Sequence, residues 1–181
     1  GQGLGDIKIN TAAFNLALND ILGAKKPLLS DSIANVVLNN YVSKQQAEKS
    51  KVTIAEGQKF LAQNKLKPNV KTTASGLQYE VIKMGTGIKP TTVDTFVAHY
   101  RGTLLNGQQF DASYDRGQPL TLGVSQVIKG WTEGLQLMPI GSHFRFWIPY
   151  ELAYGLNGQG SIPGGAMLIF EVELLDVKKK Q

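Results

Sequence analysis

A long stretch without helix-breaking residues constrains this chain more than any other feature. From Asp31 to Lys67 the sequence contains no proline and only one glycine, Gly57. Proline removes a helical hydrogen bond and glycine adds an entropic cost, so their near absence favours one continuous helix. A helix of roughly 35 residues is about 50 Å long at about 1.5 Å per residue. Ser30 or Asp31 can cap its start, and Pro68 closes the stretch.

The polar middle of this helix allows two interpretations. Residues 44–51 are nearly all polar, so the helix is either a solvated connection or a stalk that holds two protomers apart. Upstream, Thr11 can cap a shorter helix with Phe14, Leu18, Ile21 and Leu22 on one side. Nothing else in this segment is large enough to cover the apolar positions between residues 14 and 42. We therefore favour a homodimer formed through residues 1–45.

The sequence changes character after about residue 75, where glycine, aromatic and β-branched residues become frequent. Apolar and polar residues alternate over 96–101, 143–148 and 168–175, which is typical of strands buried on one face. One short helix is expected between Gly123 and Pro139, with apolar residues Val127, Ile128, Trp131 and Leu135 on one face. The fold class predicted is α+β: a curved antiparallel sheet wrapped on that helix, preceded by an all-α segment with the long connecting helix. The predicted domains are residues 1–70 and 71–181.

Several classes of function are disfavoured by what the sequence lacks. There is no cysteine, which excludes disulfides, zinc–thiolate sites and thiol nucleophiles. His99 and His143 fall on the outer face of strands, and no catalytic triad, metal-ligand cluster or phosphate-binding glycine loop is present, so no metal and no cofactor are expected. The net charge of +5 is mild and not clustered, which disfavours nucleic acid, and Lys178–Lys180 is interpreted as a solvated tail. No apolar run approaches the roughly 20 residues of a membrane span.

Six short motifs follow one another in the second region. They are His99-Tyr100-Arg101-Gly102, Gly107-Gln108-Gln109-Phe110-Asp111-Ala112-Ser113, Val127-Ile128-Lys129-Gly130-Trp131, Glu151-Leu152-Ala153-Tyr154-Gly155, Ile162-Pro163 and residues 168–175. Through them, residues 76–177 resemble the catalytic domain of FK506-binding proteins. The N-terminal part more loosely resembles the helical segment of the bacterial dimeric subfamily related to macrophage infectivity potentiator proteins, whose members are typically exported.

The resemblance implies a role for individual residues. Trp131 would form the floor of a proline pocket, and its walls would be Tyr100, Phe110, Val127, Ile128, Tyr154 and Phe170. Asp111 would be the polar group near the twisting amide, with Arg116 as its partner or, alternatively, with Asp111 capping a turn. The backbone N–H of Ile128 and the hydroxyl of Tyr154 would hold the flanking carbonyls. Ala153 and Ile162 would contribute to substrate binding, and Leu120 stands where an aromatic wall residue is common in the family.

The function that this resemblance implies is peptidyl-prolyl cis–trans isomerisation in protein folding, with proline-containing unfolded polypeptides as substrates and macrolides such as FK506 as possible inhibitors. Catalysis would be non-covalent, through a hydrophobic pocket that favours the twisted amide. The alternative is a chaperone-like client-binding module with little isomerase activity. On pattern alone, most of the aromatic residues Trp131, Phe144, Phe146 and Phe170 would be assigned to the core. The expected location is the periplasm or cell envelope of a bacterium, after removal of an export signal.

Overall fold

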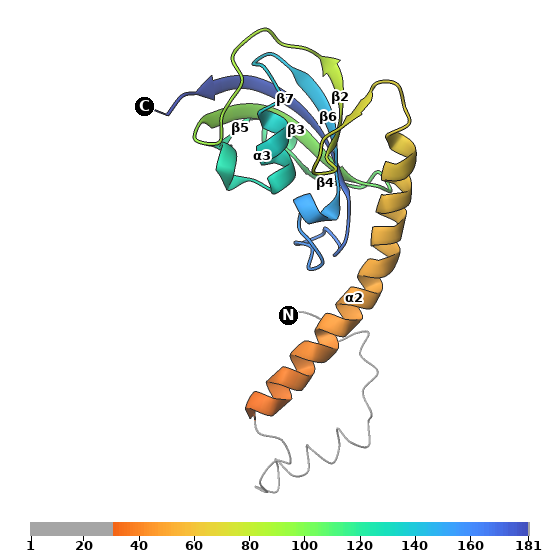
Figure 1. Ribbon diagram of the computed structural model, residues 1–181. Coiled ribbons are helices and arrows are strands. Elements are labelled where there is room, and N and C mark those ends of the chain that lie inside the picture. The colour runs from red at the N-terminus through yellow and green to blue at the C-terminus, as the bar shows by residue number, and fades with distance from the viewer. Residues whose placement is uncertain (1–30, 181) are drawn as a thin grey trace, which may run out of the picture. The chain divides into compact units, whose positions relative to one another are not determined.

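The computed structural model describes residues 31–180, with side chains from Glu48 onward and that of Lys44 (Figure 1). The helix expected around Thr11–Leu22 lies outside this range. The chain divides by its internal contacts into residues 1–44 and residues 45–181, and the account below concerns the second unit. The predicted long helix is confirmed as α2 (Asp31–Asn64). It ends shortly before Pro68, whose ring cannot continue a helix.

Seven strands form one antiparallel sheet in the described part of the chain. They are β1 (Val70–Thr72), β2 (Gln78–Lys83), β3 (Thr95–Leu104), β4 (Gln109–Ala112), β5 (Leu120–Gly123), β6 (His143–Ile148) and β7 (Leu168–Lys178). Their order is β1-β2-β6-β7-β3-β4, and β5 also pairs with β3. The alternation expected over 96–101, 143–148 and 168–175 corresponds to β3, β6 and β7.

The alternation predicted for the strands is confirmed in β3, where every second residue from Phe96 to Leu104 is buried. On the outer face, Arg145 forms ion pairs with Glu80 and Glu171, and His143 lies near Glu171 and Glu173. Trp147 departs from the pattern, because it belongs to the outer face but is only 5% exposed. A sheet position can be buried on its outer face only if another element covers that face.

The C-terminal half of α2 covers part of this domain. Ser50, Gly57 and Asn64 are buried, and their spacing of seven residues places them on one side of the helix. The amide of Asn64 donates to Gln78 Oε1 (3.0 Å), and Gln78 Nε2 donates to the carbonyl of Leu61 (2.9 Å). Gln78 is the register partner of Trp147, so these bonds place the end of α2 near the buried outer-face tryptophan.

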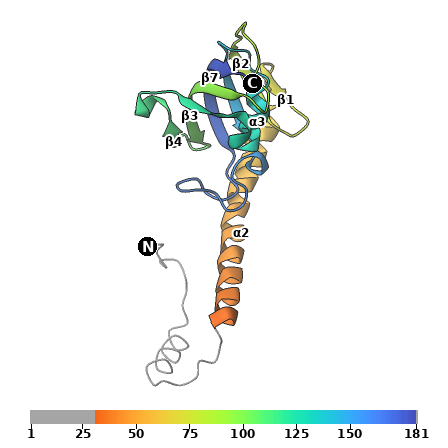
Figure 2. The same ribbon diagram turned by 90° about the vertical axis from the view of Figure 1, so that its left-hand side faces the viewer.

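One short helix, α3 (Lys129–Leu135), lies against the inner face of the sheet in both views of the ribbon (Figures 1 and 2). The sequence predicted this helix at the correct place, but it included Val127 and Ile128, which lie before the helix begins. Val127 is the extended residue that follows a turn of 3-10 helix, η2 (Val124–Gln126), and Ile128 is the residue that precedes α3. Two further 3-10 turns are η1 (Tyr114–Arg116) and η3 (Tyr150–Leu152).

Close approach between α3 and β6 depends on two glycines one helical turn apart. A Cβ at Gly130 would lie 2.5 Å from Ile148 Cγ2, and a Cβ at Gly134 would lie 2.7 Å from Phe146 Cε1. Because real Cβ atoms are not found so close to other carbon atoms, only glycine allows this packing. The core formed between helix and sheet includes Phe96, Trp131, Leu135, Phe144, Phe146, Ile148, Leu168 and Val172.

The sequence predicted a solvated tail over Lys178–Lys180, but one of these lysines forms an ion pair. Lys179 Nζ lies 2.7 Å from the carboxylate of Asp94, and the backbone N–H of Lys180 donates to the same group (3.2 Å). Asp94 is only 2% exposed and also accepts two bonds from Thr91. The solvated-tail prediction is therefore wrong for Lys179, because a buried carboxylate requires a charged partner.

Candidate active site

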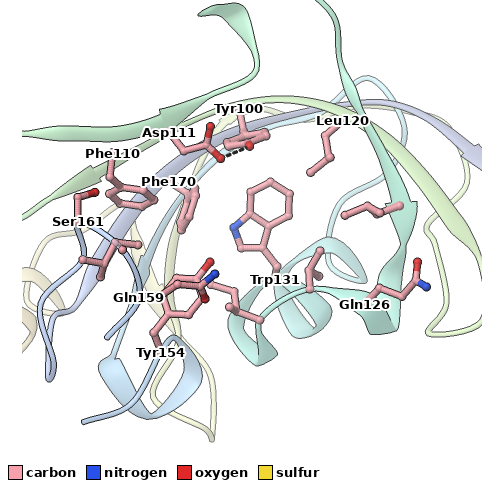
Figure 3. A pocket seen from close by; sticks show the side chains of 15 residues that line it. Tyr100, Phe110, Asp111, Leu120, Gln126, Trp131, Tyr154, Gln159, Ser161 and Phe170 are labelled. Atoms are coloured by element: carbon pink, nitrogen blue, oxygen red, sulfur yellow. Dashed lines mark hydrogen bonds between the residues drawn. The ribbon is translucent and has the colours of Figure 1, made fainter. Parts of the chain in front are cut away.

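A cleft of about 730 Å³ opens between the inner face of the sheet and the start of α3. Its lining comes from β3, β4, β5, η2, α3, the segment around Tyr154 to Ile162, and β7. The lining residues are Tyr100, Phe110, Asp111, Leu120, Leu122, Gln126, Val127, Ile128, Trp131, Tyr154, Gln159, Gly160, Ser161, Ile162 and Phe170. Figure 3 shows the indole of Trp131 at the centre of these side chains.

The base of the cleft is a cluster of edge-to-face aromatic rings. The Trp131 ring lies 5.2 Å from both Tyr100 and Phe170, at 89° and 83° to their planes. Phe110 meets Phe170 at 5.4 Å and 84°. Such contacts place positive ring edges against negative ring faces and hold each ring in one orientation. The result is a rigid apolar surface, with Trp131 only 4% exposed.

This cluster requires a glycine behind it. A Cβ at Gly102 would lie 2.6 Å from Phe110 Cζ and 2.7 Å from Phe170 Cε1. Gly102 is directly opposite both Asp111 and Phe170 in the strand register. The absence of a side chain on β3 at this point allows the rings of β4 and β7 to meet across it.

A polar network of Tyr100, Asp111 and Arg116 borders the apolar surface, and Figure 3 shows its bond between Tyr100 and Asp111. The hydroxyl of Tyr100 donates to Asp111 Oδ2, and Arg116 donates to Asp111 Oδ1 (2.5 Å) and to the Tyr100 hydroxyl oxygen (2.7 Å). The guanidinium of Arg116 also lies 5.5 Å from the Tyr100 ring centroid. The sequence-based pairing of Asp111 with Arg116 is thus present in the structure.

The network sets the charge state of its members. Burial opposes ionisation of Asp111, but the hydrogen bonds from Tyr100 and Arg116 outweigh it and hold the pKa of the carboxyl below its ordinary value. Burial, followed by the bond to Asp111, raises the pKa of Tyr100 to about 12. Burial and the nearby charge of Asp111 also raise the pKa of Tyr154. At neutral pH the cleft therefore holds one paired carboxylate and two neutral phenols.

The comparisons with known proteins agree with this geometry. Residues 86–175 match the family described as FKBP-type peptidyl-prolyl cis-trans isomerase, and residues 2–81 match the domain amino-terminal to it. The chain is 46% identical over 179 residues to the FKBP-type peptidyl-prolyl cis-trans isomerase FkpA of Aeromonas hydrophila, covering 96% of this chain and 67% of the relative. This chain belongs to the FKBP-type peptidyl-prolyl cis–trans isomerase family.

Two further relatives of this FKBP-type isomerase span most of its length. The outer membrane protein MIP of Legionella longbeachae is 40% identical, covering 96% of this chain and 78% of the relative. The crystal structure of FkpA from Escherichia coli superposes with a TM-score of 0.73 at 36% identity, covering 95% of this chain and 84% of that one. The predicted α+β fold and the predicted enzyme class are therefore confirmed, and the isomerase function is supported over the alternative of a binding module.

Most residues suggested by the sequence meet in the FKBP cleft, and two do not line it. Tyr100, Phe110, Asp111, Leu120, Val127, Ile128, Trp131, Tyr154, Ile162 and Phe170 line the cleft. Arg116 lies behind Asp111 and holds it in place. Ala153 packs against the core as a half-buried residue instead of lining the cleft.

Five lining residues were not predicted from the sequence: Leu122, Gln126, Gln159, Gly160 and Ser161. Leu122 follows Leu120 by two residues, so recognition of a strand here would have placed both on one face. Gln159 and Gly160 belong to an irregular loop whose path depends on glycines with positive φ, and no periodicity reveals such a path.

The residues that line the cleft include one carboxylate, that of Asp111, and neither histidine nor lysine. Among residues 31–180, no three histidine, aspartate or glutamate side chains gather as metal ligands. The same part of the chain contains no helix with the length and apolarity needed to cross a bilayer. What the cleft offers a substrate is an apolar floor, one paired carboxylate at its border and hydroxyl or amide groups at its rim.

Proposed function

We propose that this isomerase twists the X–Pro amide over the indole of Trp131, with the proline ring on the aromatic floor of the cleft. The observation that carries the proposal is the aromatic cluster around Trp131, bordered by Asp111 and Tyr154. With a volume of about 730 Å³, the cleft has room for a proline and parts of the flanking residues. The apolar floor suits the ring of proline, which has no N–H to satisfy.

A non-covalent mechanism is sufficient for this reaction. Rotation about an amide bond faces a barrier of about 18–20 kcal/mol because resonance is lost in the twisted state. The planar amide is the more polar of the two, so an apolar site favours the twisted amide relative to the planar one. Each ~1.4 kcal/mol of such preference speeds the reaction about tenfold. No nucleophile or general base is required.

The rim groups have distinct proposed roles. Asp111, fixed by Tyr100 and Arg116, presents a carboxylate edge to the twisting amide. The backbone N–H of Ile128 and the hydroxyl of Tyr154 would donate to the carbonyls that flank the proline, a role supported by the presence of both residues in the cleft lining. The neutral state of Tyr154 at physiological pH keeps that donor proton available.

The first test is protease-coupled isomerisation of short Leu-Pro and Phe-Pro peptides. Wild type is compared with Asp111→Ala and Tyr154→Phe, and with Tyr150→Phe as the matched control for loss of a phenol outside the cleft. We expect wild type to exceed the uncatalysed rate clearly, both cleft variants to lose about tenfold or more, and the control to match wild type. A wild-type rate equal to the uncatalysed one would refute the proposal.

We further propose that the protein acts as a homodimer through residues 1–45 and holds proline-containing unfolded polypeptides near its sites. Support comes from the apolar positions at helical spacing in that segment and from the amino-terminal family match over residues 2–81. Sedimentation equilibrium should give about twice 19.7 kDa. A single species of monomer mass at micromolar concentration would contradict the dimer.

The bacterial envelope is the proposed location, supported by the name of the Legionella longbeachae relative, an outer membrane protein. Fractionation of the native host would test it. Binding of FK506 to the cleft is proposed from the family membership. Competition of FK506 with peptide isomerisation, lost in Trp131→Ala, would support that binding.

A further inference from the structure

The loop between Tyr154 and β7 touches the cleft on one side and α2 on the other. Gln159, Gly160, Ser161 and Ile162 of this loop line the cleft. The loop is closed at its base by the N–H of Gly165, which donates to the carbonyl of Gly155 (2.8 Å). Within it, Gln159 and Ile162 exchange two backbone hydrogen bonds of 3.0 and 2.9 Å. We call residues 155–165 the cleft loop.

The other side of the cleft loop is packed on α2 without space for a further side chain. A Cβ at Gly165 would lie 2.5 Å from Ile54 Cγ1 and 3.0 Å from the carbonyl oxygen of Ser50. Gly165 has φ +75°, a conformation that favours glycine, so both its backbone and its surroundings exclude other residues. One turn further along the helix, a Cβ at Gly57 would lie 3.1 Å from Met167 Cγ.

A hydrogen bond joins the same two segments. Ser50, which is only 2% exposed, donates its hydroxyl to the carbonyl of Leu156 (3.3 Å). Leu156 is three residues from the first residue of the cleft loop that lines the cleft. Ser50 and Ile54 thus contact the two ends of the loop at Leu156 and Gly165, and Gly57 on the same face of α2 lies against Met167, just after the loop. In both ribbon views the loop before β7 runs beside α2 (Figures 1 and 2).

We propose that Ser50 and Ile54 of α2 are positioning residues of the isomerase site, which hold the cleft loop in the conformation that binds substrate. This inference rests on the proposed function of the cleft. The loop supplies one wall of the cleft, whereas the floor and the polar network come from the sheet and α3. Loosening the loop weakens binding of the planar and twisted amide alike, so KM rises while kcat changes little.

The test uses the full chain and four variants. Ile54→Ala removes the side chain under Gly165, Ile54→Val shortens it, and Ser50→Ala removes the hydroxyl without leaving a large cavity. Val52→Ala is the matched control, because Val52 lies on the same turn of α2 but is 64% exposed. The readouts are kcat and KM for a Phe-Pro peptide, and hydrogen exchange of amides 156–162 compared with those of β3.

We expect Ile54→Ala to raise KM about threefold or more with kcat within about twofold, and to speed exchange in the cleft loop but not in β3. Ile54→Val should fall between Ile54→Ala and wild type, Ser50→Ala should speed exchange around Leu156, and Val52→Ala should match wild type. The inference is overturned if Ile54→Ala leaves both loop exchange and KM unchanged. It is equally overturned if Val52→Ala produces the same changes, or if β3 exchanges faster to the same extent as the loop.

The two proposals fail in different ways. If wild type does not isomerise peptides, or if Asp111→Ala is fully active, the proposed function is refuted. Hydrogen exchange of the cleft-loop amides can be measured without catalysis. In that case, hydrogen exchange alone tests whether α2 holds the loop. If wild type is active and only the α2 variants behave as wild type, the positioning role is refuted and the proposed function stands.

Discussion

Trp131 and Phe170 meet edge to face, with their ring centroids 5.2 Å apart, although one lies in α3 and the other in β7. This contact joins the two layers of the domain at the base of the cleft. Phe170→Leu removes the ring while leaving an apolar side chain of intermediate size. We expect a loss of about 1–2 kcal/mol in the free energy of unfolding, together with a rise in KM for proline peptides. Urea denaturation measures the first and peptide isomerisation the second.

The matched control is Leu175→Ala on the same strand, because Leu175 is 43% exposed. It should change the free energy of unfolding by less than about 0.5 kcal/mol. Equal destabilisation by both variants would show that the ring contact adds nothing beyond the general stability of β7.

Gly102→Ala should lower kcat/KM by displacing aromatic rings of the cleft, with a smaller effect on the stability of the fold. The new Cβ would meet Phe110 and Phe170 at 2.6 and 2.7 Å, so at least one ring must move away from its present position. We expect kcat/KM to fall about tenfold or more. Thr103→Ala, on the adjacent residue of β3, is the control and should retain wild-type kcat/KM. A fully active Gly102→Ala enzyme would mean that the ring positions in the cleft are not critical.

The activity should be insensitive to pH over a wide range. The pKa of Asp111 lies below its ordinary value of 3.8, so the interactions of its carboxylate are fully present above about pH 5 and are lost as pH falls through the lowered pKa. The pKa of Tyr100 is raised to about 12, so the contribution of its phenol is fully present below about pH 10 and is lost as pH rises toward 12. A flat profile of kcat/KM between about pH 5 and pH 9 is therefore expected. A sharp rise or fall near pH 6.5 would instead implicate a histidine.

Asp94→Asn should destabilise the domain at neutral pH and have less effect in acid. The bond from Lys179, followed by those from Thr91, lowers the pKa of Asp94 well below its ordinary value. Because the folded-state pKa is the lower one, the ionised carboxylate stabilises the fold above the ordinary pKa, and this contribution is lost as pH falls. Thermal unfolding at pH 7 and pH 3 should show a smaller difference in Tm between wild type and variant at pH 3. A constant difference in Tm at both pH values would contradict this role.

The sequence was sufficient for the features that depend on periodicity. The helix from Asp31 was predicted because nothing interrupts it before Pro68, and the strands around Phe96, Phe144 and Phe170 were predicted because their apolar residues alternate. The identities of Trp131 and Asp111 as cleft residues did not follow from pattern. A tryptophan at helical spacing is usually core, and only the resemblance of the motifs to a family separated these two possibilities.

Features that depend on contacts between distant segments could not be predicted in this way. The alternation over 143–148 puts Trp147 on the exposed face, although it is buried, because the sequence does not show that α2 covers the sheet near Gln78. Lys179 was assigned to a solvated tail, because its partner Asp94 is 85 residues away. Leu122 and Gln159 were missed because a short edge strand and an irregular loop have no strong periodic signal.

The glycines of α3 have a consequence for how this cleft can vary. Gly130 and Gly134 let the helix lie directly on Ile148 and Phe146, and Trp131 is carried between them. Any side chain at either glycine would lift the helix away from β6 and carry the indole toward the opening, making the cleft shallower. The depth of the cleft thus depends on the lack of a side chain at Gly130 and Gly134, on the side of α3 that faces β6. Substitutions at the rim can change which residues are accepted next to the proline without changing how far the proline ring enters.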